Sequence, residues 1–255
     1  CGLDSERDTE EEVENILRIV PRVLRGMPSI FYCNSLRSIA FLPKIAQLRM
    51  MLFENSDADA RWWIEFALPN LVRTPSNIGD QNEGLFDERA FVVLRRLKEM
   101  GLFRKEDIHR YGLLNKLCTS GKRSFPEQRF RFLSDWNPNA LRQTDADGWL
   151  PLHCAAQSTR QGFRLVFEAG ICHFPNEDGI RLLFQKDNYG GTPFQLTCNW
   201  HGREKTSNAI ENALVNQSDN LYDTQRVLLS AASDRTIHLD CVYFVLRREP
   251  DAIAQ

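Results

Sequence analysis

The segment DADGWLPLHCAA, residues 145–156, carries the clearest structural pattern in the chain. Its glycine, Gly148, permits the positive φ angle that a tight turn requires. Pro151 suits the first position of a helix, because an amide hydrogen there would have no partner within the helix. Ala155 and Ala156 are small, which lets a neighbouring helix approach closely. The stretch therefore predicts a turn followed by a short, closely packed helix that begins at Pro151.

A second copy of this pattern follows 42 residues later, as DNYGGTPFQLTC at residues 187–198. It aligns Gly190 with Gly148 and Pro193 with Pro151. Two fainter copies are RYGLLNKLCTS at residues 110–120, with Gly112 in the glycine position, and DTQRVLLSAAS at residues 223–233, where Gln225 takes that position. Self-similarity at intervals of this length indicates an array of helical units, each of which buries its apolar face against its neighbours.

The residue before each proline is held out of helical geometry and is therefore placed to cap the helix. Thr192 has a hydroxyl that can do this, whereas Leu150 has none. A longer second helix should follow in each unit and carry bulkier apolar residues. In one unit these are Phe163, Val166 and Phe167, and in the last unit they are Cys241, Phe244, Val245 and Leu246. The long 42-residue interval is explained by an extra segment at 171–185, which we expect to add a small helix.

Apolar residues at helical spacing predict further helices, at 13–24, 39–48, 62–68, 87–100 and 126–136. Pro21 should interrupt the first of these, and Pro69 should end the third. We expect Asp87 to cap the fourth helix and Gly101 to follow its end in the left-handed conformation. Residues 73–84 are typical of a loop. Since no segment alternates like a long strand, the chain is predicted to be mostly helical.

The composition of the 255 residues excludes several classes of protein. With 42% hydrophobic and 26% charged residues, the chain is neither collagen-like nor wholly disordered. A formal net charge of −2 gives no general attraction to nucleic acid or to anionic membranes. Two basic stretches, at 95–110 and 122–131, are diluted by acidic residues. The longest apolar runs are far shorter than the roughly 20 residues of a membrane-spanning helix.

The cysteine and histidine residues do not form a recognised site. The seven cysteines are widely scattered, which favours reduced thiols in a cell interior over a disulfide framework. Only Cys198 and His201 have a compact metal-ligand spacing, and a zinc site usually needs two such pairs. No signature of a thiol hydrolase surrounds any cysteine, and no phosphate-binding loop is present. We therefore expect no metal, no cofactor and no enzymatic activity.

The two clearest copies resemble the ankyrin repeat, in which a turn with Asp and Gly precedes the letters TPLH. GWLPLHCAA is close to that signature, and GGTPFQLTC matches it more weakly. The stretches PNAL at 138–141 and PDAI at 250–253 are similar to a divergent, long-unit subtype found in microalgae. The resemblance covers residues 110–255. It implies a domain of divergent ankyrin repeats there and a degenerate ankyrin-like or capping helical region at 1–109.

The chain departs from the ankyrin pattern at one pair of residues. In ankyrin repeats the Thr and His of the motif cooperate in tying the turn to the helix. One unit here has His153 but Leu150 in place of Thr, and the other has Thr192 but Gln195 in place of His. Each unit therefore keeps half of the pair.

The resemblance implies an all-α, ankyrin-type helix-turn-helix solenoid with irregular units. Such a stack is elongated, and its turn tips and first helices line a concave surface suited to holding another protein. The function it implies is a non-catalytic protein-interaction or scaffold module, without a small-molecule substrate and without nucleic acid. The predicted binding residues are Asp147, Trp149, Asn188, Tyr189, Trp200 and His201. For Trp149 an alternative is equally open, in which it packs along a neighbouring turn.

Two other functions stay open at this point. The chain is either a structural subunit that docks onto a large assembly through its first 100 residues, or the substrate-docking part of a larger enzyme. It begins at Cys1 and stops at Gln255, just where another turn would follow. We therefore expect the parent protein to begin before Cys1, and we expect either further repeats after residue 255 or a stack without a terminal cap. The expected location is intracellular: cytoplasmic, nuclear, or in an organelle if a targeting segment has been removed.

Overall fold

The computed structural model describes residues 8–19, 39–52, 67–74, 82–119, 124–175, 177–215, 229 and 233–248. Within these ranges every regular element is a helix, and one isolated bridge joins Gln185 to Ile237. The prediction of an all-α chain is therefore confirmed. None of the described helices has both the length and the apolar character needed to cross a membrane.

The first part of the chain contains α1 (Glu10–Ile19), the 3-10 helix η1 (Ile39–Phe41), α3 (Leu42–Leu52), helical residues 67–72 and α5 (Glu83–Glu99). Helix α1 packs on α3, and α3 packs on α5. Pro43 is the second residue of α3, in its first turn, where proline is tolerated. Residues 20–38 and 53–66, which include Pro21, Trp62 and Trp63, lie outside the described part of the chain.

Two predictions in this region are wrong. Pro69 does not end a helix, because it lies inside the helical residues 67–72 and its carbonyl accepts a hydrogen bond from the Arg73 amide. Asp87 does not cap α5, because that helix already begins at Glu83, in the segment predicted as a loop. Asp87 instead pairs with the buried Arg129 from α8 (Glu127–Trp136), with 2.6 Å between the carboxylate and Nε. The role of Asp87 is therefore to pair with Arg129, a residue distant in sequence, and not to cap a helix.

Gly101 ends α5 as predicted, with a φ of 72°. Its amide donates to the carbonyl of Lys98, and the Leu102 amide donates to that of Leu97. This pattern satisfies carbonyls that the end of a helix leaves unpaired, and the left-handed residue it requires is usually glycine. The chain then turns sharply into α6 (Lys105–Arg110).

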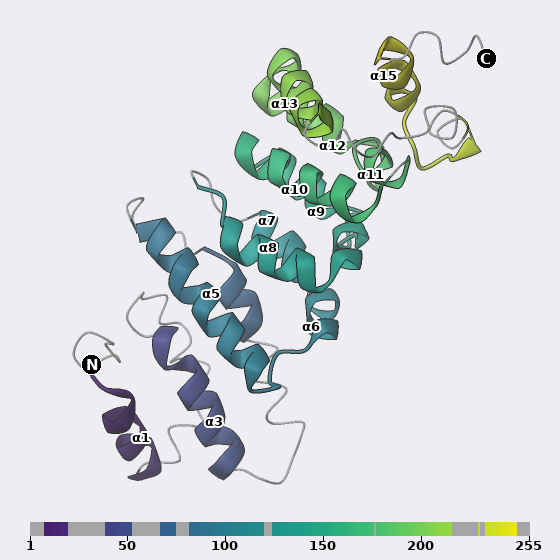
Figure 1. The fold of residues 1–255 in the computed structure, drawn as a ribbon. Helices are drawn as coiled ribbons and strands as arrows, with labels where there is room; N and C mark the ends of the chain where they lie inside the picture. Colours follow the sequence, from purple (N-terminus) through teal and green to yellow (C-terminus); the bar gives the residue numbers. More distant parts are fainter. Residues whose placement is uncertain are drawn as a thin grey trace.

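Three helix pairs follow in the chain (Figure 1). They are α7 (Leu113–Cys118) with α8 (Glu127–Trp136), α9 (Pro151–Ala156) with α10 (Arg160–His173), and α12 (Pro193–His201) with α13 (Arg203–Val215). The first helices form one row, in which α7 packs on α9 and α9 on α12. The second helices continue a row that begins with α5, so that α5 packs on α8, α8 on α10 and α10 on α13. Both predicted prolines, Pro151 and Pro193, begin the first helix of a pair.

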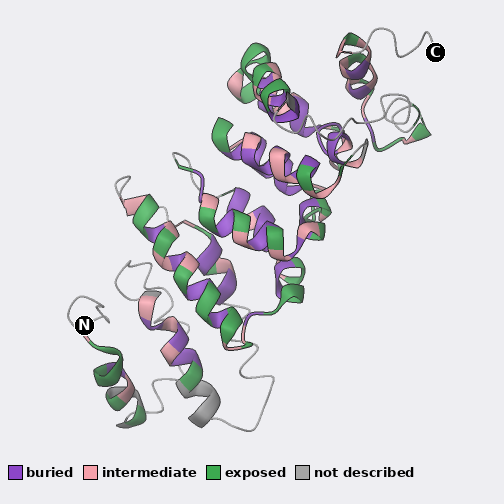
Figure 2. Ribbon diagram, in the orientation of Figure 1, coloured by how far each residue is buried: buried purple, intermediate pink, exposed green. Residues whose placement is uncertain are grey.

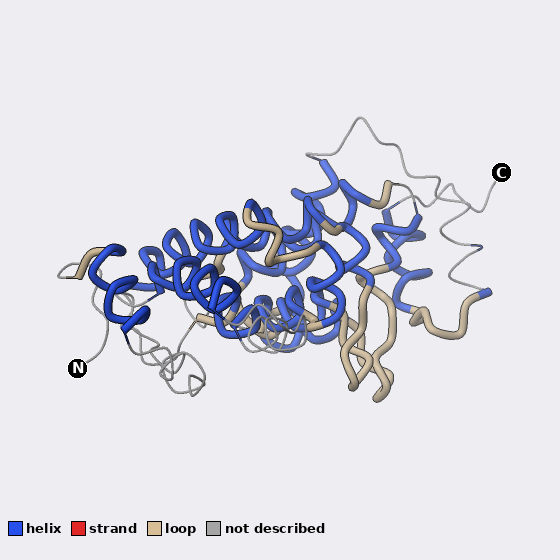
Figure 3. The backbone as a smooth tube through the Cα atoms, turned by 90° about the horizontal axis from the view of Figure 1, so that it is seen from below, coloured by secondary structure: helices blue, strands red, loops and turns tan. Residues whose placement is uncertain are grey.

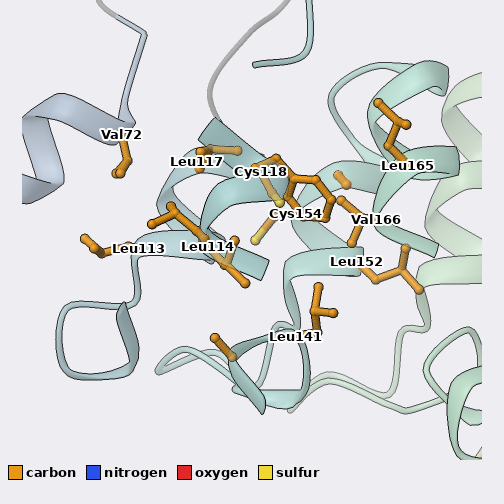
Figure 4. Close-up of a cluster of buried hydrophobic side chains, with 14 of the residues drawn as sticks. Val72, Leu113, Leu114, Leu117, Cys118, Leu141, Leu152, Cys154, Leu165 and Val166 are labelled. Atoms are coloured by element: carbon orange, nitrogen blue, oxygen red, sulfur yellow. The ribbon is translucent and has the colours of Figure 1, made fainter. Parts of the chain in front are cut away.

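The apolar core runs continuously between these rows, and Figure 2 shows the buried faces turned towards neighbouring helices. Cys118 of α7 and Cys154 of α9 meet inside it, next to Leu114 and Leu152 (Figure 4). Burial raises the pKa of the Cys154 thiol to about 12, and it raises that of Cys118 well above its usual value. Both side chains therefore act as small uncharged core residues.

The fainter copies agree less well with the structure. Helix α7 begins one residue after Gly112, whereas α9 and α12 begin three residues after their glycines, so the predicted alignment of this copy is wrong by two residues at the helix start. The copy at 223–233 lies outside the described residues apart from Leu229 and Ser233, as does PDAI at 250–253. Helix α15 (Asp240–Arg248) buries Cys241 and Val245.

The segment predicted as an extra helix contains α11 (Glu177–Arg181). The short stretch PNAL forms η3 (Pro138–Arg142), and Arg142 of η3 pairs with Asp178 of α11 at 2.5 Å. Asp178 also lies 4.0 Å from Arg181, which pairs with Asp234 in the turn before α15. Four alternating charges, named the α11 ion-pair chain, thus connect η3, α11 and the turn before α15.

Candidate protein-interaction surface

Two turns with the same hydrogen bonds precede α9 and α12, at residues 145–149 and 187–191, and are named the finger turns. In the first, the Asp145 amide donates to the Trp149 carbonyl at 3.0 Å, and the Gly148 amide donates to the Asp145 carbonyl at 3.1 Å. The Asp145 carboxylate accepts from the amides of Asp147 and Trp149 at 3.0 and 2.9 Å. One aspartate side chain therefore holds the whole turn.

The second finger turn repeats each of these bonds 42 residues later. The Asp187 amide donates to the Gly191 carbonyl at 2.8 Å, and the Gly190 amide donates to the Asp187 carbonyl at 3.1 Å. The Asp187 carboxylate accepts from Tyr189 and Gly191 amides at 2.9 and 2.8 Å. Gly148 and Gly190 have φ angles of 80° and 83°, which explains why glycine occupies both positions.

The finger turns are bonded directly to each other. The Asn188 amide donates to the Asp147 carbonyl at 3.1 Å, and the Asn188 side-chain amide donates to the Ala146 carbonyl at 3.0 Å. The Tyr189 hydroxyl lies 3.4 Å from the Asp147 carboxylate. Figure 3 shows loops that project from one edge of the helix stack. Because these hydrogen bonds join the two turns, their tips have a defined spacing.

The two turns are joined to their helices by different side chains. In the second unit the Thr192 hydroxyl accepts from the Gln195 amide at 3.2 Å, which is the predicted cap. Leu150 cannot accept such a bond, and in the first unit His153 serves instead, because its Nδ1 accepts from the Leu150 amide at 3.0 Å. Each unit thus uses the half of the Thr and His pair that it has.

His153 also connects one unit to the next. The ring is fully buried, and its Nε2 lies 3.4 Å from the Gly191 carbonyl in the second finger turn. Since Nδ1 accepts a hydrogen bond, the proton of the neutral ring is on Nε2 and points to Gly191. Burial lowers the pKa of His153 against the opposing effects of the Gly191 carbonyl and of Asp187 and Asp145, so the ring is neutral at neutral pH.

The predicted site residues fall into two groups. Asp147, Asn188 and Tyr189 lie exposed at the tips of the finger turns, and Tyr189 is 80% exposed. Trp149, by contrast, is half-buried. Its ring stacks on that of His153, with 6.4 Å between the ring centres. Its Nε1 is shielded from solvent and has no hydrogen-bond partner among the described residues. Trp149 therefore supports the turn from beneath, which favours the alternative in which this residue packs against the turn.

Trp200 and His201 form the second group, at the last turn of α12. Trp200 is 63% exposed, whereas His201 is half-buried. Burial, together with the positive charges of Arg160 and Lys205, lowers the pKa of His201. The two groups are separated by the length of α12, roughly 12 Å along the helix axis.

Sequence reasoning missed the cations near Trp200. Arg160 begins α10, and Arg203 and Lys205 lie in the first turn of α13. In the sequence Arg160 is an isolated charge, more than 40 residues before Arg203 and Lys205. Only the packing of α10 against α13 brings them to the same end of the stack. A repeat alignment extended through the second helices would have indicated this.

Features that would support catalysis are few in the described part of the chain. No group of three or more His, Cys, Asp or Glu side chains there is arranged to hold a metal ion. A groove of about 390 Å³ between α8 and α10 contains the exposed Cys172 and a pair of His173 with Asp135 at 3.2 Å. A second groove, of about 1010 Å³, lies between α13 and α15 and contains Arg203, Glu211 and Tyr243.

No family model, no curated protein and no solved structure matches this chain.

Proposed function

We propose that this chain is a non-catalytic protein-interaction module, built as a divergent ankyrin-type stack, which holds a partner protein along its finger turns and first helices. The observation that carries the proposal is the hydrogen-bonded pair of finger turns. Their backbones are bonded to each other through Asn188, and they present Asp147, Asn188 and Tyr189 to solvent at a defined spacing.

A rigid array of this kind suits recognition for an energetic reason. Binding costs free energy when mobile groups must be ordered, and groups that are already fixed avoid most of that cost. The Asp145 and Asp187 carboxylates each hold two backbone amides, so the turns are ordered before any partner arrives. Tyrosine is also among the residues most enriched where interfaces gain most of their energy.

The proposal is tested by capturing partners on the immobilised chain from an extract of its source cells and identifying them by mass spectrometry. Tyr189→Ser, combined with Asn188→Ala, should reduce capture of a specific partner at least tenfold. A matched control is Tyr243→Ser, since Tyr243 is 70% exposed but lies on α15, away from the finger turns. Equal capture by the chain and by the doubly substituted variant would reject the finger turns as the binding surface.

The alternative of an assembly subunit has one observation in its favour. Leu85 and Val92 are exposed and lie seven residues apart on α5, hence on the same side of that helix. An apolar strip in the first part of the chain is what docking onto a neighbour requires. Capture that is lost with Val92→Lys but kept with Tyr189→Ser would favour this function.

A further inference from the structure

A group of cations lies near the last turn of α12, at the end of the first helices that is farther from the finger turns. Arg160, Arg203 and Lys205 are exposed and form no ion pair with any residue in the described ranges. Together with Trp200 and His201 they are named the Trp200 patch. The patch combines residues of α10, α12 and α13, so it exists only in the folded stack.

The charges of the patch converge on the last turn of α12. The positive charges of Arg160 and Lys205 both act on the ring of His201, and that of Arg203 acts on Cys198, one turn earlier. Glu204 is the only acidic residue in the first turns of α10 and α13. Asp240 of α15 also acts on Cys198, so three cations lie near two carboxylates. The patch keeps a positive balance in a chain whose formal net charge is −2.

The opposite end of the same surface has the opposite charge. Asp145 and Asp147 lie exposed in the first finger turn, and Asp187 lies in the second. A nucleic-acid strand that followed the first helices would meet these carboxylates after leaving the cations, and its phosphates would be repelled. A short segment of protein can place its acidic residues at one end only. The charge distribution thus favours a short acidic peptide over a nucleic-acid strand.

We propose that the Trp200 patch binds an acidic segment of a partner protein, in which two or more carboxylates flank an aromatic or aliphatic residue. The apolar residue packs on the exposed face of Trp200, and the carboxylates pair with Arg160, Lys205 and Arg203. Arginine and an exposed tryptophan are both characteristic of the residues that dominate binding energy, and arginine offers two parallel donors to a carboxylate. This inference rests on the proposed function and specifies the chemistry of the partner.

The test uses a phage-displayed library of random dodecapeptides, selected on the whole chain. Selected peptides are then synthesised and titrated by fluorescence anisotropy against the chain, against Arg160→Glu/Lys205→Glu and against Lys105→Glu. Lys105 is a matched control, because it is an exposed lysine in the first turn of another helix, α6, and also lacks an ion pair in the described part of the chain. Circular dichroism verifies that all variants keep their helix content. A single-stranded thymidine 20-mer is titrated in parallel.

The expected result is a set of peptides enriched in Asp and Glu around an apolar residue. They should bind Arg160→Glu/Lys205→Glu at least tenfold more weakly than the chain, and Lys105→Glu within twofold. Acidic peptides that bind the double variant equally well would overturn the inference. Peptides that are neutral or basic and depend on Tyr189 would also overturn it while leaving the proposed function in place. Binding of the thymidine 20-mer without selection of acidic peptides would reassign the patch to nucleic acid, and selection of no peptide at all would contradict the proposed function as well.

Discussion

Asn188 fills the space beside Gly148 that a side chain at that position would need. A β-carbon on Gly148 would lie 2.6 Å from the Asn188 side-chain oxygen and 2.9 Å from the Asn188 backbone nitrogen. Gly190 has nearly the same φ angle, but no atom lies within 4 Å of its own β-carbon position. The two glycines of the finger turns are thus required for different reasons, one for its φ angle alone and the other also for the contact between the turns.

This difference predicts unequal effects of the same substitution. Gly190→Ala should lower the free energy of unfolding by about 1–2 kcal/mol, the cost of a side chain at positive φ. Gly148→Ala has that cost and also displaces Asn188 from its bonds to Asp147 and Ala146, which adds about 1–2 kcal/mol. Urea denaturation followed by circular dichroism measures both. Equal losses in the two variants would show that the finger turns do not touch as described.

The buried His153 predicts a stability that depends on pH. Burial lowers its pKa in the folded chain from the ordinary 6.5, so the unfolded chain binds the proton more tightly. This contribution to stability is complete above pH 6.5 and is lost as the pH falls towards the lower folded-state pKa, by at most ~1.4 kcal/mol per pH unit. Urea denaturation of the chain and of His153→Gln between pH 8 and pH 5 measures it. Glutamine is a suitable replacement because Gln195 occupies the same place in the next unit.

The difference between the two pH profiles isolates His153 from the carboxylates and from His201, whose pKa is also lowered. The chain should lose stability below pH 6.5 more steeply than His153→Gln does. Parallel profiles would mean that the ring is protonated without cost, and therefore that its Nδ1 does not accept from Leu150.

Among the charged residues of the described part, Arg129 should cause the largest loss of folding stability when it is replaced. Its guanidinium is fully buried and donates to the Asp87 carboxylate, to the carbonyls of Leu71 and Val72 at 2.7 and 3.1 Å, and to the Thr74 hydroxyl at 3.1 Å. Arg129→Met should lower the free energy of unfolding by about 3–5 kcal/mol, because it leaves Asp87 and two carbonyls without their partner.

Arg131→Met is the matched control for Arg129→Met. Arg131 lies two residues later on the same helix and pairs with Glu127 at 2.8 Å, but its side chain is 60% exposed. Its loss should cost about 0.5 kcal/mol or less. Similar losses for the two substitutions, measured by urea denaturation, would contradict the buried network.

The described cysteines should differ sharply in reactivity. Cys172 is exposed, whereas Cys118, Cys154 and Cys241 are buried, and burial raises the pKa of Cys154 and Cys241 to about 12. Iodoacetamide at pH 8 should therefore modify Cys172 within minutes and leave the three buried thiols intact until the chain is unfolded in urea. Peptide mapping by mass spectrometry reads each site separately. Rapid modification of Cys154 in the native chain would show that α7 and α9 do not pack as described.

Local rules predicted the features whose physics is confined to a few neighbouring residues. Pro151 and Pro193 begin helices, and Gly101 follows one, because the missing amide and the absent side chain act on the backbone of the same turn. The paired finger turns followed from the repeated Asp and Gly, since each turn is held by its own aspartate.

The wrong predictions concern residues whose environment comes from distant parts of the chain. Asp87 resembled a cap because nothing near it in sequence indicates Arg129, 42 residues later. For Trp149 the sequence left contact and packing open, because the turn alone does not show that the His153 ring lies beneath it. The cations of the Trp200 patch were missed for the same reason, because they meet through the packing of α10 on α13.

The α11 ion-pair chain has a consequence for how this end of the molecule comes apart. Stacks of independent units fray from their ends, one unit at a time, because each is held only by its neighbour. Here Arg142, Asp178, Arg181 and Asp234 connect η3, which precedes α9, to the turn before α15, 92 residues further on. Opening the last turn removes a partner from α11, and the loss of α11 removes an ion pair from η3, which also packs on α8, α9 and α10. The inserted helix α11 thus links parts of the stack that would otherwise be independent, and we expect this end of the molecule to open more cooperatively than it would without these ion pairs.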